Sequence, residues 1–369
     1  MTDRPLEQHA EAHEGGVLTI DLSAIRANYR LLRGMVEGAE CGAVVKADGY
    51  GLGAARLARA LFDEGCRSFF TAHLAEAMAL RPHLPASARI VVLHGPSPGT
   101  SHLFRQNGVV PVLNSREQIA EWRAVGADMS AWLQFDSGMT RFGLDEQEIG
   151  SLDLEGLQIQ AVMSHLACAD DAAHPANAAQ LACFTRIRRR FADIPASLSA
   201  SSGIFLGPEF HFDIVRPGAA LYGVNPQPGR PNPLLPVIRL QGRVLQLRHV
   251  PAGTAIGYGH TVRTADATQL ATVAVGYADG FLRSTGAAGG AWVGDVWMKL
   301  LGRVSMDSIV LDATGVDLRP GMLVDLINPR HDVDSAGAAS GTIGYEILTS
   351  LGHRFARVIL DPADKPAES

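Results

Sequence analysis

Lysine is scarce in this chain. The 369 residues include 32 lysines and arginines together, and only three of these are lysines, at positions 46, 299 and 365. A genome composition that favours arginine accounts for most of this bias. Few side chains are therefore available for a reaction that needs a neutral amine, because arginine does not give up its proton in proteins.

Cysteine is also rare, and its spacing excludes two classes of site. Cys41, Cys66, Cys168 and Cys183 form no Cys-x-x-Cys pair. Four cysteines in a chain of this length do not make the disulfide framework of a small secreted protein. We interpret them as reduced, mostly packed thiols, which predicts a cytoplasmic protein.

Long apolar runs and excess positive charge are missing as well. Residues 1–16 are polar, so we expect no secretory signal, and no apolar run reaches the length of a bilayer span. The formal net charge of −6 argues against a general binder of nucleic acid or anionic membranes. With 47% hydrophobic residues, the chain can bury a large core, and its length fits about two domains.

Short apolar runs typical of buried strands recur through the first part of the chain. Amphipathic helical runs lie between most of them, clearest at 54–64, 116–125 and 177–191. This alternation predicts an α/β fold with parallel strands, and eight strands fit a (β/α)8 TIM barrel. A doubly wound open sheet is the alternative. The predicted strands are 42–45, 68–72, 90–93, 109–113, 131–135, 159–163, 196–200 and 212–215.

The hydrophobic pattern of the sequence changes after a proline-rich stretch at 225–236. Helical spacing gives way to strand-like runs, with one late helix at 345–351. We therefore predict a disordered lead over 1–15, a barrel domain over 16–235 that begins with a strand at 18–22, and a mostly-β domain over 236–369. The strand-like runs of the second domain are 237–250, 254–263, 270–276, 296–300, 308–311 and 322–327.

Polar side chains follow nearly every predicted barrel strand. In a TIM barrel the functional residues lie at the carboxyl ends of the strands, where the βα loops begin. This placement predicts one site formed by several strand ends. The residues concerned are Lys46, Asp48, His73, His94, Asn114, Asp136, His165, Ser201, Ser202 and Arg216.

Lys46 has two explanations that the residues alone leave open. Burial lowers the pKa of an amine and frees the neutral nucleophile that attacks an aldehyde. The glycines at 49–53 could let backbone amides approach an anion. A lysine that attacks an aldehyde and a neighbouring anion site together suggest pyridoxal 5'-phosphate. A lysine that reaches solvent from a strand end before a tight bend explains the same residues. A dinucleotide-binding loop is a weaker alternative.

Other candidate residues are equally ambiguous by themselves. Arg216–Gly218 follows the last barrel strand and is either a turn or part of a phosphate site. His165, Cys168 and Asp170 have no matching metal ligands elsewhere, so we predict no metal. Tyr258 lies between glycines, where a packed aromatic ring is the ordinary explanation.

Seven motifs in order make the sequence similar to the bacterial alanine racemase family. They are AVVKADGYG at 43–51, DSGMTRFG at 136–143, SHLACAD at 164–170, VRPGAALYG at 215–223, VGYADG at 275–280, GRVSMD at 302–307 and YE at 345–346. The resemblance spans nearly the whole chain. It implies a pyridoxal-phosphate enzyme with a barrel domain and a C-terminal β domain.

The resemblance also implies a two-base mechanism. Lys46 would hold the cofactor and act as the base on one face of the substrate α-carbon. Tyr258 from the partner subunit of a homodimer would act on the other face. One base on each face is the simplest way to invert a stereocentre by proton transfer.

Further roles are carried over from the same resemblance. Arg216 would face the pyridine nitrogen of the cofactor, and His165 would link Arg216 to Tyr258. The residues implied to bind the cofactor are Lys46, Tyr50, His165, Ser202, Arg216, Gly218, Ala219 and Tyr345. The residues implied to meet the amino-acid substrate are Arg141, Met306, Asp307 and Tyr277.

Two positions depart from the family pattern. Gln134 stands where the family commonly has a lysine whose carbamate holds the arginine at position 141, and Ser201 replaces an asparagine. The implied activity is interconversion of L- and D-alanine, for peptidoglycan or for alanine breakdown. Gln134 keeps open a racemase of serine, lysine or other amino acids. A decarboxylase or a non-catalytic carrier of the cofactor is a weaker alternative.

Overall fold

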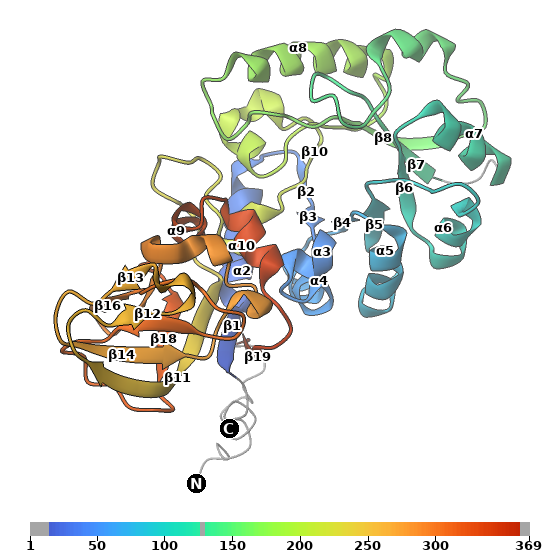
Figure 1. Cartoon of the computed structure of the whole chain (residues 1–369). Coiled ribbons are helices and arrows are strands. Elements are labelled where there is room, and N and C mark those ends of the chain that lie inside the picture. The colour runs from blue at the N-terminus through green and yellow to red at the C-terminus, as the bar shows by residue number, and fades with distance from the viewer. Residues whose placement is uncertain (1–14, 126–129, 362–369) are drawn as a thin grey trace, which may run out of the picture. The chain divides into compact units, whose positions relative to one another are not determined.

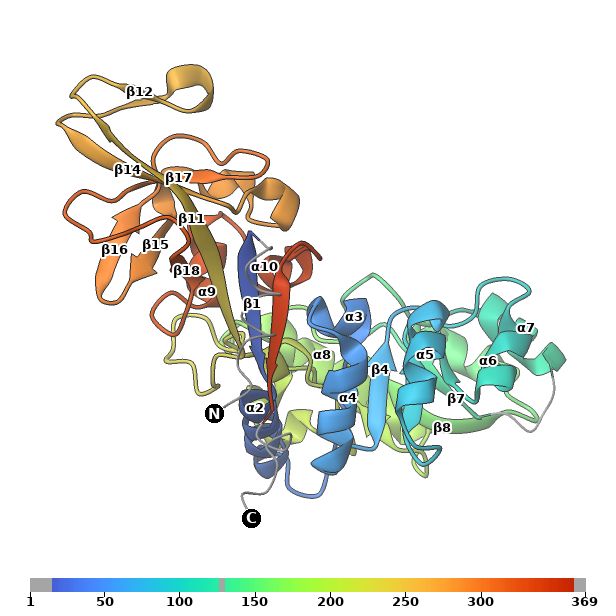
Figure 2. The same cartoon turned by 90° about the horizontal axis from the view of Figure 1, so that it is seen from below.

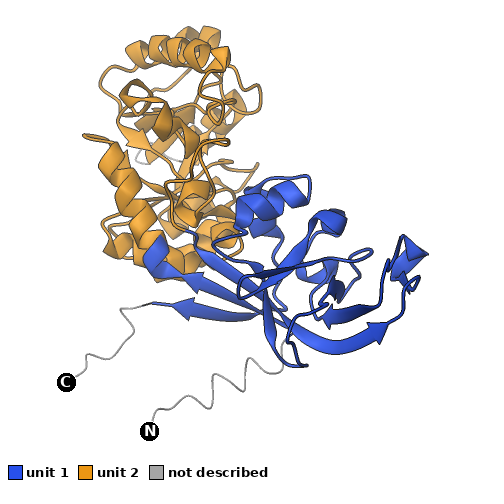
Figure 3. Ribbon diagram, turned by 90° about the vertical axis from the view of Figure 1, so that its left-hand side faces the viewer, with its two compact units in different colours: residues 1–24, 236–369 blue, residues 25–235 orange. Residues whose placement is uncertain are grey.

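Two units make up the part of the chain that the structure describes (Figure 3). The computed structural model describes residues 15–125 and 130–361. One unit is residues 25–235, and the other combines residues 1–24 with 236–369. The predicted lead over 1–15, apart from its last residue, lies outside the described residues.

Parallel strands form a closed ring in the unit of residues 25–235. Strands β3 to β9 pair in sequence order, β10 pairs with β2, and a parallel bridge joins Arg216 to Ala200. The ring therefore closes, which confirms the TIM barrel and excludes the open sheet. The strands are β2 (Glu40–Cys41), β3 (Ala43–Val44), β4 (Ser68–Thr71), β5 (Arg89–Val92), β6 (Val110–Leu113), β7 (Ser130–Gln134), β8 (Gln158–Met163), β9 (Ala196–Ser197) and β10 (Ile214–Val215).

Amphipathic helices cover the outside of these strands, as Figures 1 and 2 show for α4 to α7. In α4 the apolar side chains of Leu57 and Leu61, four residues apart, are buried together on one face. The helices are α2 (Leu22–Met35), α3 (Lys46–Tyr50), α4 (Ala54–Asp63), α5 (Leu74–Leu80), α6 (Ser101–Asn107), α7 (Arg116–Val125) and α8 (Pro175–Arg190), with 3-10 turns η1 (Arg81–His83), η2 (Glu146–Ser151), η3 (Ser202–Leu206), η4 (Pro208–Phe210) and η5 (Ala219–Tyr222).

An eight-stranded sheet forms the second unit, with β1 between β11 and β19. A separate hairpin of β12 and β13 projects from the end of β11 and β14 (Figure 2). The strands are β1 (Gly16–Asp21), β11 (Ile238–Val250), β12 (Ala255–Ile256), β13 (Val262–Arg263), β14 (Thr268–Val273), β15 (Gly290–Val293), β16 (Val296–Lys299), β17 (Ile309–Asp312), β18 (Leu323–Ile327) and β19 (Ala356–Leu360). Its helical segments are η6 (Tyr258–His260), η7 (Tyr277–Asp279), η8 (Arg283–Ala288), α9 (Val333–Ala339) and α10 (Gly344–Ser350).

The first strand differs from the sequence prediction, which placed residues 16–235 in the barrel. Residues 16–21 form β1, which pairs antiparallel with β11 and parallel with β19. Leu18 and Ile20 are fully buried in this sheet. The alternating pattern was read correctly as a strand, but alternation does not say which sheet a strand joins.

The cysteines and the lengths of the helices bear on two of the predictions made from the sequence. All four cysteines are free. Among the described helices, none has the length and apolar character needed to span a bilayer.

Candidate active site

Lys46 stands at the carboxyl end of β3, directly before a left-handed turn. Residues 47–51 all have positive φ, between 53° and 80°. Glycine adopts such angles freely, whereas Ala47 and Asp48 carry a Cβ that makes them unfavourable. Backbone hydrogen bonds close the turn, from Gly49 N–H to Val45 O at 2.9 Å and from Gly51 N–H to Ala47 O at 2.7 Å.

The glycines at 49–53 serve this turn, whose N–H groups at 49 and 51–54 already have acceptors. A Cβ on Gly49 would lie 2.5 Å from Leu57 Cδ1 and 3.2 Å from the backbone of Ala54, so a larger residue would have to displace its neighbours. The N–H groups of residues 51–53 donate to backbone carbonyls, and that of Ala54 donates to Asp48 Oδ1 at 2.8 Å. These N–H groups, together with that of Gly49, already have acceptors, which argues against the possibility that they approach an anion.

The environment of the Lys46 amine favours its neutral form. Burial is the main cause that lowers the pKa of Lys46, and the nearby positive charge of Arg141 lowers it further. The carboxylate of Glu76 acts in the opposite direction. A neutral lysine at a barrel strand end can act as a nucleophile or a base.

Arg216 provides a positive charge inside the barrel. Its side chain is 2% exposed, and its guanidinium donates to Ser164 O at 2.7 Å and to the Ser197 hydroxyl. Burial lowers the pKa of Arg216 to about 9. No carboxylate of the described residues forms an ion pair with it. A cation held in this way suits a ligand that brings negative charge or an acceptor nitrogen.

His165 lies against Arg216, with its Nδ1 3.4 Å from an Nη of the guanidinium. Burial, followed by the positive charge of Arg216, lowers the pKa of His165 to about 3. The ring is therefore neutral at physiological pH. This contact is one part of the predicted link from Arg216 through His165 to Tyr258, and the part that involves Tyr258 stays a prediction.

The neutral state of His165 predicts a loss of stability in acid. In the unfolded chain a histidine binds a proton near pH 6.5, so the unfolded state binds more protons between pH 6.5 and 3. Stability should therefore fall as the pH falls through this window. From pH 7 to 5 we expect a contribution of about 2 kcal/mol, measured as the difference in urea unfolding free energy.

His165→Gln is the matched variant for that measurement. Glutamine does not titrate, so the variant should lose about 2 kcal/mol less than the wild type between the same two pH values. Other acidic and basic groups contribute to both proteins and cancel in the comparison. Equal losses would contradict a neutral His165.

A hydroxyl and a glycine shape the loop after β10. Ser201 Oγ accepts the N–H groups of Gly218 at 3.0 Å and Ala220 at 3.1 Å. A Cβ on Gly218 would lie 2.5 Å from Tyr50 Oη, so the phenol packs directly against this glycine. Ser201, the second departure from the family pattern, thus holds the loop that carries Gly218.

Two backbone N–H groups near this loop have no hydrogen-bond acceptor among the described residues. Ser202 begins η3 and Ala219 begins η5, and neither N–H donates a hydrogen bond within the described residues. Gly218 directly precedes Ala219 in the sequence, and the Tyr50 phenol contacts Gly218. The structure therefore groups these four predicted residues at the carboxyl ends of β3, β9 and β10.

A carboxylate folds the loop that carries Arg141. Asp136 Oδ1 accepts the N–H groups of Gly138, Met139 and Thr140 at 2.8, 2.9 and 3.1 Å. Thr140 has a φ of 58°, an unfavourable angle for a β-branched residue. Arg141 follows directly, so the loop fixes the backbone position from which its exposed side chain extends.

Gln134 does not hold Arg141. The Gln134 side chain is 7% exposed, and its amide donates to the backbone oxygen of Phe142 at 3.5 Å. Among the described residues, no side chain forms an ion pair or hydrogen bond with the Arg141 guanidinium, which lies 5.8 Å from the Phe142 ring centre.

Three residues of the second unit are brought together by paired loops. Tyr277 N–H donates to Ser305 O at 3.0 Å, next to Met306. Arg354 Nη1 pairs with Asp307 at 2.8 Å, and its Nε pairs with the buried Asp279 at 2.9 Å. These contacts place Tyr277, Met306 and Asp307 close together in this unit.

The remaining predicted residues of this unit are tyrosines on short helical segments. Tyr258 lies at the tip of the β12–β13 hairpin and is 69% exposed. Its neighbours Gly257 and Gly259 have positive φ and shape this tip. Tyr345, 36% exposed, is the second residue of α10. The predicted site residues therefore fall into two groups, one in each unit.

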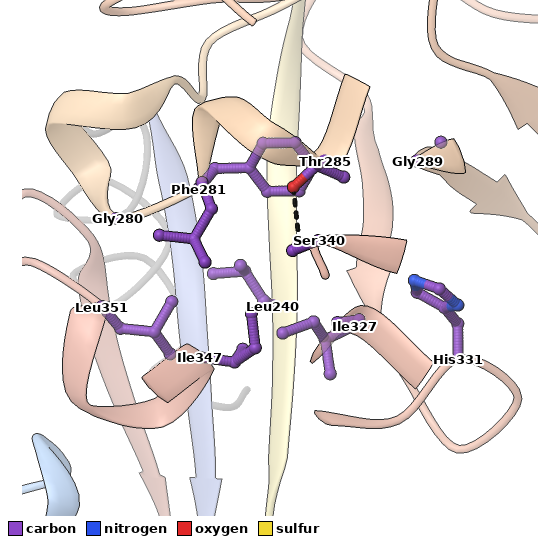
Figure 4. A pocket seen from close by; sticks show the side chains of 13 residues that line it. Leu240, Gly280, Phe281, Thr285, Gly289, Ile327, His331, Ser340, Ile347 and Leu351 are labelled. Atoms are coloured by element: carbon purple, nitrogen blue, oxygen red, sulfur yellow. Dashed lines mark hydrogen bonds between the residues drawn. The ribbon is translucent and has the colours of Figure 1, made fainter. Parts of the chain in front are cut away.

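An apolar pocket in the second unit is separate from these residues. It lies between β11, η8 and the two helices α9 and α10, and a hydrogen bond of 2.7 Å joins Thr285 to Ser340 at its wall (Figure 4). The space is about 20 Å³, enough for about one water molecule. We interpret it as a packing gap.

Comparison with known proteins covers both units. Residues 20–226 match the family model of the alanine racemase N-terminal domain, and residues 237–359 match that of its C-terminal domain. A catabolic alanine racemase of Mesorhizobium japonicum is 50% identical over 94% of both chains. One of Agrobacterium fabrum is 46% identical over 98% of this chain and 96% of its own.

A solved structure agrees with this relationship. Alanine racemase from Bartonella henselae, described with covalently bound pyridoxal phosphate, superposes with a TM-score of 0.90 at 40% identity. The match covers 94% of this chain and 99% of that one. The closed barrel, the β unit and both family models agree, and the chain belongs to the alanine racemase family.

Proposed function

We propose that this protein is a pyridoxal-phosphate-dependent racemase that interconverts L- and D-alanine. The observation that carries the proposal is the identity of 50% to a catabolic alanine racemase over 94% of each chain. The amine, cation and carboxylate-binding residues that such a reaction needs are all present in the motifs. The names of the relatives also favour alanine as the substrate.

The barrel residues fit the cofactor. Lys46 offers its aldehyde an amine whose pKa is lowered by burial, and the N–H groups of Ser202 and Ala219, which have no acceptor among the described residues, suit its phosphate. Arg216, which is buried and has no carboxylate partner among residues 15–125 and 130–361, suits the pyridine nitrogen. When bound, the cofactor delocalises the charge that develops at the substrate α-carbon.

The chain's own residues move and place the proton. Lys46 takes or returns a proton on one face of the α-carbon, and Tyr258 does so on the other. Arg141 binds the substrate carboxylate. Arg216 only donates hydrogen bonds and does not give up its proton, so it would leave a ring nitrogen that faced it unprotonated, which would disfavour side reactions.

We further propose a homodimer in which Tyr258 serves the partner's barrel. Within one chain this phenol is 69% exposed at the tip of a projecting hairpin, an unusual position for a catalytic base unless another surface covers it. The four free cysteines support a cytoplasmic location. The reaction is reversible, so the same enzyme serves cell-wall synthesis or alanine breakdown.

Chiral chromatography tests this function. Purified protein loaded with the cofactor is incubated with a panel of L-amino acids, and the D-enantiomers are quantified. Alanine should reach an equal mixture of both enantiomers. The proposal would be abandoned if the cofactor binds and no amino acid racemises.

A broader substrate range is the second candidate. The observation that favours it is the weak hold on Arg141, since Gln134 contacts Phe142 and supplies no anion. The same panel decides, because a broad racemase would convert serine or lysine at rates comparable to alanine. A decarboxylase is disfavoured because residues 236–369 contain no cysteine.

Asp136→Asn should weaken substrate binding more than it slows the chemistry. Asparagine keeps the size but loses the charge that holds three backbone N–H groups, so the loop before Arg141 loosens. We expect KM for alanine to rise about tenfold with a smaller change in kcat. Steady-state kinetics measure both constants.

Asp332→Asn is the control for this variant. Asp332 also accepts a backbone N–H, from Ser335 at 2.8 Å, but it caps α9 and contacts none of the predicted site residues. It should leave KM unchanged. An unaltered KM in Asp136→Asn would contradict the role of the loop in placing Arg141.

A further inference from the structure

Glu76 makes more backbone contacts than its place in α5 requires. Its Oε2 accepts the N–H groups of Ala72 at 2.7 Å and His73 at 3.0 Å, where α5 begins. A glutamate at this position of a helix commonly binds the N–H at the helix start. Its other oxygen, Oε1, accepts the N–H of Ala47 at 2.6 Å. This third contact is unrelated to the helix.

The contact to Ala47 reaches the turn behind Lys46. Ala47 has a φ of 53° and begins the run of five left-handed residues, although it is not glycine. A charged acceptor makes one of the stronger hydrogen bonds available to a backbone N–H. The Glu76 carboxylate therefore ties the end of β3, where Lys46 stands, to the end of β4.

We propose that Glu76 is a positioning residue that holds the left-handed turn in place and thereby fixes where the Lys46 amine stands. The inference rests on the proposed function, in which Lys46 binds the cofactor. Glu76 itself does not touch the cofactor or transfer a proton. Its effect passes through the backbone of Ala47, the residue next to the lysine.

The small number of lysines allows a direct measurement. Apoprotein is mixed with pyridoxal phosphate, the reaction is stopped with borohydride at set times, and modified peptides are quantified by mass spectrometry. Lys299, which is exposed on β16, is the reference amine within the same molecule. In the wild type Lys46 should react much faster than Lys299.

Glu76→Gln should slow this capture. Glutamine keeps the size but has one acceptor oxygen and no charge for three N–H groups, so the turn relaxes and the amine is misplaced. We expect the rate at Lys46 to fall about 10- to 100-fold, with the rate at Lys299 unchanged. Glu121→Gln is the matched control, because Glu121 accepts the N–H of Gly99 at 2.7 Å in another βα loop.

A second substitution separates positioning from helix capping. Ala47→Gly removes the cost of a positive φ, so it should restore much of the capture rate in the Glu76→Gln background. If Glu76 only caps α5, Glu76→Gln would lower the melting temperature, leave capture unchanged and give no such rescue. Glu76→Asp provides the same test should Glu76→Gln fold poorly.

The outcomes distinguish the two proposals. Slow capture in Glu76→Gln that Ala47→Gly rescues supports the positioning role. Capture at the wild-type rate in Glu76→Gln overturns it and leaves the proposed function intact. If the wild type itself shows no preferential capture at Lys46, the proposed function fails.

Discussion

Lys46→Ala is expected to abolish both racemisation and the visible absorbance of the protein-bound cofactor. Alanine has no amine, so the covalent attachment and the base on one face of the substrate are lost together. We expect kcat/KM for alanine to fall by about four orders of magnitude or more. The absorbance spectrum of the purified protein and the racemisation rate measure the two effects separately.

Lys299→Ala is the control for this experiment. Lys299 lies on β16 in the other unit and belongs to none of the family motifs. Its loss should change neither spectrum nor rate. An unchanged spectrum in Lys46→Ala would show that another group holds the cofactor, and it would remove Lys46 from the proposed mechanism.

Mixing two inactive variants should restore activity if the active site is shared between subunits. Lys46→Ala and Tyr258→Phe would each be inactive alone, because every site lacks one base. A mixed dimer contains one site with both defects and one with neither. With random exchange half the dimers are mixed, so about one site in four is intact and about a quarter of the wild-type rate should return.

Subunit exchange must be shown in the same sample. Two variants of different mass allow mixed dimers to be counted by native mass spectrometry. The two Lys46→Ala and Tyr258→Phe preparations assayed alone give the baseline. Mixed dimers that form without recovery of activity would contradict a role for Tyr258 in the partner's site.

The barrel was predictable because its strands are short, apolar and separated by amphipathic helices. The predicted strand at 68–72 and helix at 54–64 match β4 and α4 closely. The second unit was harder. β15 and β19 were missed because the first is four residues long with a glycine, and the second contains Arg357 in a run with little alternation. Their pairing comes from partners far away in the chain.

The resemblance identified the site residues, but it did not identify the residues that hold them in place. Lys46 could not be distinguished from an ordinary strand-end lysine without the resemblance. Glu76 was not predicted to have any role, because a glutamate early in a helix already has a sufficient local explanation. Its partner Ala47 lies 29 residues away, and only the folded barrel brings the two together.

The glycine-rich turn shows the limit of sequence patterns most clearly. Its composition suggested a loop that binds an anion, but the structure uses the glycines to turn the backbone left-handed. The same residues satisfy both patterns, and only the hydrogen-bond partners separate them. Asp48 and the backbone carbonyls of the turn supply those partners.

The position of β1 affects the order in which the chain can assemble. This strand is made first, yet its neighbours β11 and β19 begin at residues 238 and 356. During synthesis residues 25–235 are therefore made before either neighbour of β1 exists. The second unit therefore depends on contacts of very long range, which are slow to form and prone to mispairing. Removing residues 16–21 would leave the barrel sequence intact and open the β sheet between β11 and β19.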